Sequence, residues 1–276
     1  LGFKPDFAWT KSRSTAENNG LFDSVRGLPK FLRSDSEDNE YTLAAGTPVS
    51  FISNGINFTN GSGEINESTR NYVVWAWKAG GNKNTFNVDD VGYASAAAAG
   101  LTGGSYSLTK ASVGTKQGFS IVQWTHSSGT AGTINHGLLE APTFIIYKSS
   151  ANDTRWTVGH NSLGWTRGLV LDTNSAQLAA DGAYWNSTAP TSSVFSIGDT
   201  GQIGNGNALA YCWHDVPGLQ KFGSYVGDGS SDGPFIELGF RPAVVWVKIY
   251  SGTDSNWVIL DKERDPDNVV QNNLYA

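Results

Sequence analysis

A short motif recurs three times in this chain and limits the folds that the chain can adopt. Each copy has the form Leu-x3-Pro-x5-Lys, and the copies cover residues 1–11, 138–148 and 238–248. The proline suits the start of a strand, where a missing N–H breaks no ladder hydrogen bond. The apolar and aromatic residues that follow it are typical of a strand buried on both faces. Because a repeat of this kind sets the architecture, we expect a fold built from similar β-rich modules.

Further matched segments support the repeat. Residues 71–77 and 207–213 both run from Asn to Trp through apolar residues, at an offset of 136 residues, against 137 for the first two motifs. An aromatic opening strand precedes the second motif at Phe119–Trp124 and the third at Phe222–Val226. Equivalent middle segments are Leu21–Asp23, Trp156–Val158 and Trp257–Asp261. Each module is therefore predicted to run from an aromatic opening strand to a Trp-rich closing strand.

These matches divide the chain into four parts. Residues 1–81 form a first module without its opening strand, 119–218 a complete central module, and 219–276 a truncated third module. Residues 82–118 have no counterpart and form a low-complexity connector, either packed against a neighbour or flexible. Both termini fall inside modules, so we expect the chain to be part of a longer one. The alternative is that the incomplete modules complete one another, within or between chains.

Composition and strand spacing indicate the fold class. The chain has 33 Gly, 12% aromatic residues and only 16% charged residues, which suits many short strands joined by turns rather than disorder. Strand-like runs are Tyr41–Leu43, Val49–Ile52, Tyr72–Trp77, Phe119–Trp124, Phe144–Tyr147, Leu169–Leu171, Phe195–Ile197, Leu209–Trp213 and Val244–Ile249. We expect an all-β protein of tandem antiparallel β-sandwich, jelly-roll-like modules. Helix should be limited to short turns, for example near Ser24–Leu32.

Charge and cysteine content exclude several classes of function. A net charge of −6 argues against a nucleic-acid or anionic-membrane surface, either of which would need a basic patch. No apolar run approaches the ~18 residues of a membrane span, so no membrane insertion is expected. The lone Cys212 lies in an apolar run, which indicates a buried, inert thiol, and no Cys/His cluster suits zinc.

Aromatic side chains are the best binding candidates. Trp124, Trp165 and Trp185 flank polar or glycine-containing turns, where an exposed indole face would stack on a sugar ring. We therefore predict these three as glycan-binding residues. The alternative is that they belong to the core, as most Trp residues of a β-sandwich do.

Acidic side chains give weaker candidates. Asp228 and Asp232 could hold calcium through loop oxygens, although their spacing differs from an EF-hand and a solvated turn is the alternative. A glycosidase needs two carboxyl groups across a cleft, and adjacent residues such as Asp89 and Asp90 point to opposite faces of an extended segment. We predict no catalytic residues, no enzyme activity, no bound metal and no cofactor.

Four longer stretches, residues 21–27, 73–81, 185–198 and 222–235, resemble a known repeat family. That family occurs in large virion proteins of marine tailed phages, cyanophages especially, and is described as tail-fibre-like or concanavalin-lectin-like. The similarity extends over nearly the whole chain, including the connector. The resemblance implies a place in the virion, on the outer surface of the particle, and brings no established site residues.

Repeat and resemblance together give a functional hypothesis. We expect a non-enzymatic structural and adhesion component of a phage virion, such as a tail fibre, that presents its modules to host-surface glycans. Multivalent display would multiply weak contacts. Expected partners are other virion proteins and copies of the same chain, with a trimer if it is a fibre. The alternatives are a head-decoration or neck protein that binds only virion proteins, and a polysaccharide-degrading tailspike.

Overall fold

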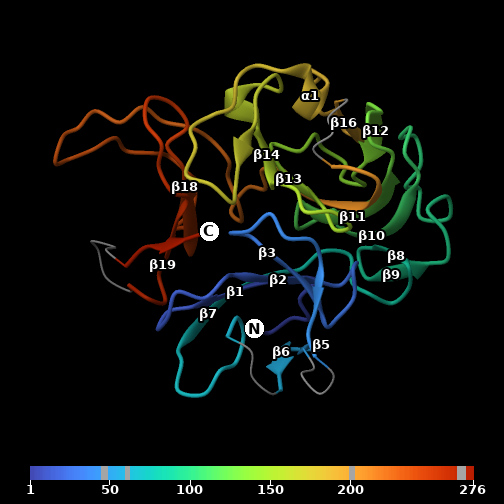
Figure 1. Ribbon diagram of the computed structural model, residues 1–276, viewed down its shortest axis with the longest axis horizontal. Coiled ribbons are helices and arrows are strands. Elements are labelled where there is room, and N and C mark those ends of the chain that lie inside the picture. Colours follow the sequence, from blue (N-terminus) through green and yellow to red (C-terminus); the bar gives the residue numbers. More distant parts are fainter. Residues whose placement is uncertain (45–48, 60–62, 199–202, 266–271) are drawn as a thin grey trace.

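The computed structural model describes residues 1–44, 49–59, 63–198, 203–265 and 272–276, and nearly all of its regular structure is antiparallel β-sheet (Figure 1). The helical elements among these residues are η1 (Asn161–Leu163) and α1 (Gly182–Trp185). The expected all-β fold class is confirmed. None of the helices described here has the length and apolar character needed to cross a membrane.

The first copy of the repeat forms a five-stranded sheet in the order β4-β3-β2-β1-β7. Its strands are β1 (Phe7–Ser12), β2 (Gly20–Asp23), β3 (Lys30–Arg33), β4 (Tyr41–Thr42) and β7 (Tyr72–Trp77). A separate hairpin of β5 (Val49–Ile52) and β6 (Gly55–Phe58) packs its apolar side chains with the same sheet. In Ser24–Leu32, where a short helical turn is expected, hydrogen-bonded turns lead into β3, and one of them is closed by a helix-type bond from the Gly27 N–H to the carbonyl of Asp23.

The central copy forms an eight-stranded sheet in the order β15-β14-β13-β17-β11-β10-β8-β9. Its strands are β8 (Phe86–Val88), β9 (Val91–Tyr93), β10 (Leu108–Gly114), β11 (Phe119–His126), β13 (Phe144–Ser149), β14 (Thr157–His160), β15 (Leu169–Val170) and β17 (Gly206–Trp213). A pair of β12 (Gly132–Asn135) and β16 (Val194–Ile197) covers one face. Residues 82–118, predicted as a connector, thus supply three strands of this sheet.

The third copy forms a three-stranded sheet of β18 (Val244–Val247), β19 (Val258–Asp261) and β20 (Leu274–Tyr275). All nine strand-like runs named from the sequence overlap strands of the structure. The predicted opening strand at Phe222–Val226 is not observed, and these residues have no regular secondary structure. Its counterpart Phe119–Trp124 lies within β11, as expected.

Strand pairing follows the repeat residue by residue. Phe7 stands opposite Asp23, Phe144 opposite His160, and Val244 opposite Asp261. The closing strands keep the register too, since Phe7 pairs with Trp77 and Phe144 with Trp213. Because a slip by one residue would turn every side chain to the other face, this shared register shows that the copies are equivalent.

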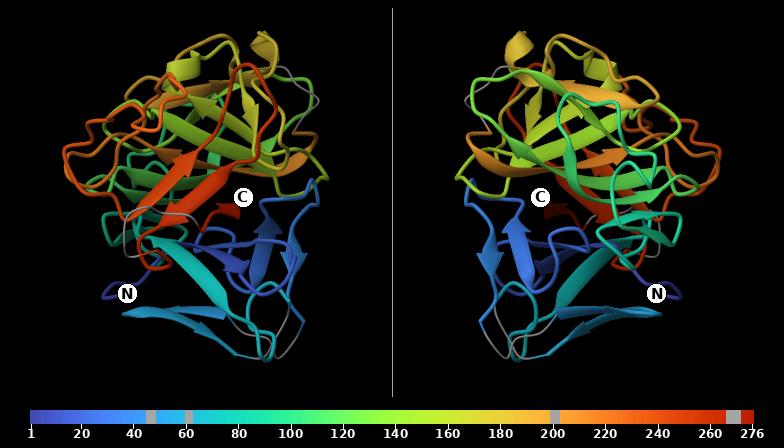
Figure 2. Two further views of the ribbon diagram at one scale, coloured as in Figure 1. Left: turned by 90° about the vertical axis from the view of Figure 1, so that its left-hand side faces the viewer. Right: turned by 90° about the vertical axis from the view of Figure 1, so that its right-hand side faces the viewer.

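One hydrophobic cluster joins all three copies. It contains Phe7 and Trp9 of the first copy, Phe144 of the second, and Trp257 and Ile259 of the third. At its centre the indoles of Trp77, Trp213 and Trp246 lie 5.8–6.4 Å apart, pair by pair. Figure 2 shows the red β18–β19 hairpin between the blue strands and the green-yellow sheet. The incomplete modules therefore share a core with the central one.

Candidate functional site

The three predicted glycan-binding tryptophans are buried. The side chains of Trp124 and Trp185 are 0% exposed and that of Trp165 is 6% exposed. Trp165 and Trp185 pack edge to face with ring centroids 5.0 Å apart, and Trp124 packs edge to face on Phe195. The expectation that these indoles are exposed is wrong, because all three belong to one buried hydrophobic cluster of the central copy. The alternative, a place in the core, is confirmed.

The predicted calcium ligands lie on the surface. Asp228 and Asp232 are exposed in a segment without regular structure, and an Asp228 carboxylate oxygen accepts a hydrogen bond from the Ser230 N–H at 2.9 Å. This hydrogen bond lowers the pKa of Asp228. Within the described ranges, no group of three or more His, Cys, Asp or Glu side chains is placed to hold a metal ion. The arrangement at Asp228 is that of a solvated turn.

Two buried titratable side chains of the central copy, Cys212 and His136, have structural roles. Burial raises the pKa of the Cys212 thiol, as expected for an inert cysteine in the core. His136 is buried, with Nε2 3.1 Å from the carbonyl of Thr191, and its Nδ1 accepts the N–H of Leu138. Burial lowers the pKa of His136 to about 4, so the imidazole is neutral near pH 7.

A buried Asp–Arg pair joins the first copy to the second. Arg26 Nε lies 2.5 Å from Asp23 Oδ2, and Arg26 also donates to the carbonyl of Leu21 at 2.7 Å. The hydroxyl of Tyr211, on the closing strand of the second copy, donates to Asp23 Oδ2 at 2.8 Å. Burial opposes the charge of Arg26, but Asp23, Tyr211 and Glu40 together outweigh burial, and the pKa of Arg26 is raised.

The same pair recurs at the equivalent place in the third copy. Arg264 Nε lies 2.7 Å from Asp261 Oδ2 and donates through Nη2 to the carbonyl of Ile259 at 2.9 Å. The indole N–H of Trp75, on the closing strand of the first copy, donates to Asp261 Oδ2 at 3.2 Å. The sequence analysis missed these residues, although the shared spacing Asp-x-x-Arg at 23–26 and 261–264 was available as a signal.

Three hydrogen bonds connect the copies head to tail in a closed ring. They run from Trp156 Nε1 to the carbonyl of Arg33 (2.6 Å), from Trp257 Nε1 to that of Val170 (2.9 Å), and from Asn19 Nδ2 to that of Tyr275 (3.2 Å). The donors occupy equivalent positions before β14, β19 and β2, and the acceptors occupy equivalent positions on β15, β20 and β3. The second copy thus donates to the first, the third to the second, and the first to the third.

The lysines of the Leu-x3-Pro-x5-Lys motif add to this ring. Lys148 donates to the carbonyls of Glu37 and Thr154, and Lys248 to those of Asn174 and Ser255. In each case one carbonyl belongs to the lysine's own copy and the other to the preceding copy. Lys11 donates to the carbonyl of Glu17, the position equivalent to Thr154 and Ser255. Lys148 and Lys248 therefore each connect their own copy to the preceding one.

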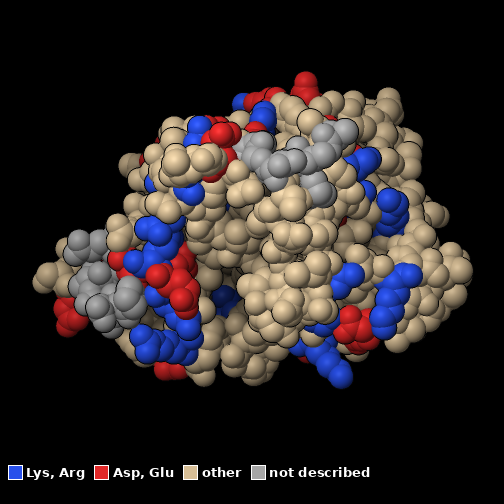
Figure 3. Space-filling view, turned by 90° about the horizontal axis from the view of Figure 1, so that it is seen from below, with Lys and Arg blue, Asp and Glu red and all other residues tan. Residues whose placement is uncertain are grey.

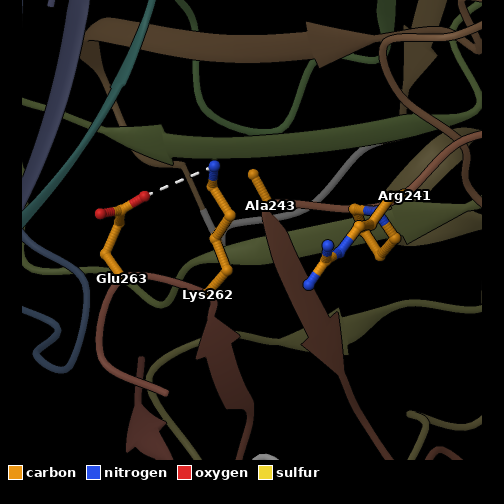
Figure 4. A pocket seen from close by; sticks show the side chains of 5 residues that line it. Arg241, Ala243, Lys262 and Glu263 are labelled. Atoms are coloured by element: carbon orange, nitrogen blue, oxygen red, sulfur yellow. Dashed lines mark ion pairs between the residues drawn. The ribbon is translucent and has the colours of Figure 1, made fainter. Parts of the chain in front are cut away.

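A cavity of about 360 Å³ lies at the start of β18. Arg241, Pro242, Ala243, Lys262 and Glu263 line it (Figure 4). Its one ion pair joins Lys262 Nζ to Glu263 at 3.5 Å, and both side chains are exposed. The lining of the cavity thus carries two basic side chains, Arg241 and Lys262, and one carboxyl group, that of Glu263.

The comparison with protein families gives one match, to the model of a domain of unknown function (DUF7483), over residues 1–276. No curated protein and no solved structure matches the chain.

Proposed function

The chain belongs over its full length to the DUF7483 family, and we propose that it is a non-enzymatic structural component of a phage virion appendage. The head-to-tail ring of three repeats carries this proposal. Its buried charged side chains, Arg26 and Lys148 among them, contact the neighbouring copy through hydrogen bonds to the Tyr211 hydroxyl and the Glu37 carbonyl. The sequence resemblance adds the place, the surface of a tailed-phage particle.

Surface charge supports a role in protein assembly over nucleic-acid binding. On the face drawn in Figure 3, basic and acidic side chains are interspersed, and uncharged residues cover most of the area. The net charge is −6. A nucleic-acid surface would instead gather Lys and Arg on one face.

The second part of the hypothesis, glycan adhesion, is not supported by the tryptophans predicted to bind glycan. Because Trp124, Trp165 and Trp185 are buried, a sugar ring has no access to their faces. The proposal is therefore limited to a structural role. A homo-oligomer, trimeric in a fibre, is part of it, and sedimentation of the purified chain tests this part.

Immuno-electron microscopy of purified particles tests the proposed place. Antibodies raised against this chain should label fixed sites on particles of the phage that encodes it. Particles of an unrelated phage serve as the control. A chain that is abundant in the lysate of infected cells and absent from purified particles would contradict the proposal.

A further inference from the structure

One strand of the repeat lacks a neighbour that its two counterparts have. β1 lies between β2 and β7, and β13 lies between β14 and β17. β18 pairs with β19, and no strand of the described residues pairs with its other edge. The N–H of Lys262 donates to the carbonyl of Ala243. Because hydrogen-bonding direction alternates along an antiparallel strand, the N–H and C=O groups of Val244 and Trp246 face the unpaired edge.

In the other two copies, the residue equivalent to Ala243 contacts the chain just beyond the closing strand. In the first copy the equivalent of Ala243 is Asp6, whose carboxylate accepts the N–H groups of Ala79 and Gly81, just beyond β7. In the second copy the equivalent is Thr143, whose hydroxyl lies 3.4 Å from Asp215, just beyond β17. Ala243, which lines the cavity of the third copy, has no polar side-chain atom for such a contact.

Exposed apolar side chains lie in the segment that precedes β18. Phe222–Val226 matches the opening strand β11, which pairs with the closing strand β17 in the central copy. In the third copy this segment is not a strand, and Val226 and Phe235 are 85% and 88% exposed. An unpaired strand edge together with exposed apolar residues is typical of a protein-binding site.

We propose that the free edge of β18 accepts an extended strand from a partner protein, which pairs antiparallel to β18 and completes the third copy. In a second copy of this chain the closing strands β7 and β17 are already paired with β1 and β13, so neither is free to supply this strand. This inference deepens the structural role proposed above and rests on it. Strand addition of this kind draws affinity from main-chain hydrogen bonds and specificity from alternate side chains.

The register of the other two copies defines the chemistry of the incoming strand. Aromatic residues, Trp77 and Trp213, stand opposite the positions equivalent to Val244. Small residues, Ala76 and Cys212, stand opposite the next position. The incoming strand should therefore carry aromatic side chains opposite Val244 and Trp246, with a small residue between them.

His160 selects the aromatic residue opposite Trp246. In the other two copies the residues at that place are Tyr211 and Trp75, which donate to Asp23 and Asp261 of a neighbouring copy. In the second copy, the residue at the position of Asp23 and Asp261 is His160. Its Nδ1 accepts the Ser162 N–H, so in the neutral ring Nε2 carries the proton and donates. A tyrosine hydroxyl oxygen can accept a hydrogen bond from the Nε2–H group, whereas an indole N–H can only donate. Tyrosine is therefore favoured opposite Trp246.

A peptide of residues 205–217 with the change Cys212→Ala is the probe, since it carries the aromatic–small–aromatic pattern with tyrosine in the required place. We expect saturable, micromolar binding to the full chain, measured by fluorescence polarisation. N-methylation at Tyr211 removes an N–H that pairs with the neighbouring strand and should weaken binding about tenfold. N-methylation at position 212 is the matched control, because that N–H faces away, and binding should stay within about twofold. The change Tyr211→Phe should weaken binding several-fold.

Hydrogen exchange locates the bound peptide. Amide exchange should slow in residues 244–248 when peptide is added and stay unchanged in residues 144–149. No saturable binding up to about 1 mM would overturn the proposal. Equal effects of the two N-methyl groups would also overturn it, as would protection at 144–149. Protection of 244–248 that rises with protein concentration alone would assign the edge to a second copy instead. None of these readouts depends on where the chain lies in a particle, so failure here and failure of the proposed function are distinguishable.

Discussion

The Asp23–Arg26 pair shows how single residues hold this molecule together. Both side chains are 0% exposed, and Asp23 Oδ2 accepts from both Arg26 and Tyr211. A buried pair gains little over a well-packed apolar pair, but removing one partner leaves an uncompensated charge in the core. The pair is therefore best understood as a device that fixes how two copies meet.

Substitution of one partner should cost far more than substitution of both. Asp23→Leu leaves the Arg26 guanidinium buried, and we expect the free energy of unfolding to fall by about 3–5 kcal/mol. The double variant Asp23→Leu, Arg26→Met should lose much less. Urea denaturation measures both. Equal losses in the single and double variants would show that the buried charge is not the cause.

His136 should make stability depend on pH. Its pKa is about 4 in the folded protein and about 6.5 when unfolded, so the unfolded chain binds more protons between these values. This contribution is complete above pH 6.5 and is lost as pH falls towards 4, by at most about 3 kcal/mol. His136→Gln should flatten the fall, measured by denaturation at pH 7, 5.5 and 4.5. An unchanged pH profile would exclude His136 as a source.

The exposure of some individual side chains was not predictable from the sequence. Trp165 and Trp185 stand beside polar turns, which suggested surface positions, yet the two indoles pack on each other beneath those turns. Which face a turn covers depends on contacts between distant segments, and these leave no local pattern. Cys212 was placed correctly, because a continuous apolar run does leave such a pattern.

The positions of most strands of the repeat were predictable, although the opening strand expected at Phe222–Val226 does not form. The Leu-x3-Pro-x5-Lys motif locates β1, β13 and β18, and the offsets of 136 and 137 residues match the observed register. Three strands outside the repeat were missed. β8, β9 and β10 lie in sequence that looked like a connector, because small residues and glycines there give weak periodicity. Their pairing with the central sheet is decided by tertiary contacts.

Gly159 on β14 should tolerate no side chain. A Cβ there would lie 2.5 Å from ring atoms of both Trp165 and Trp185. Gly159→Ala should therefore lower the free energy of unfolding by about 1–3 kcal/mol through overpacking. Gly168→Ala is the control, since its nearest atom is 3.5 Å away, and it should change stability by less than about 0.5 kcal/mol. Similar losses in the two variants would contradict this account of the packing.

At the scale of the whole molecule, three unequal copies behave as parts of one ring. The hydrogen bonds of Trp156, Trp257 and Asn19 close it, and the shared cluster fills its centre. Mutual completion of the incomplete modules was one alternative that the sequence left open, but the direction of the ring could not be derived from the sequence. That direction depends on which copy's carbonyl each donor meets, and only the folded chain shows this.

The most direct test of the ring is scanning calorimetry of the full chain. Because the three copies share one core, we expect a single unfolding transition with the calorimetric enthalpy equal to the van't Hoff enthalpy. Trp257→Phe removes one bond of the ring and should shift this whole transition to lower temperature without splitting it. Two or more separate transitions, with only one of them moved by Trp257→Phe, would show that the copies fold as independent modules and would contradict the account.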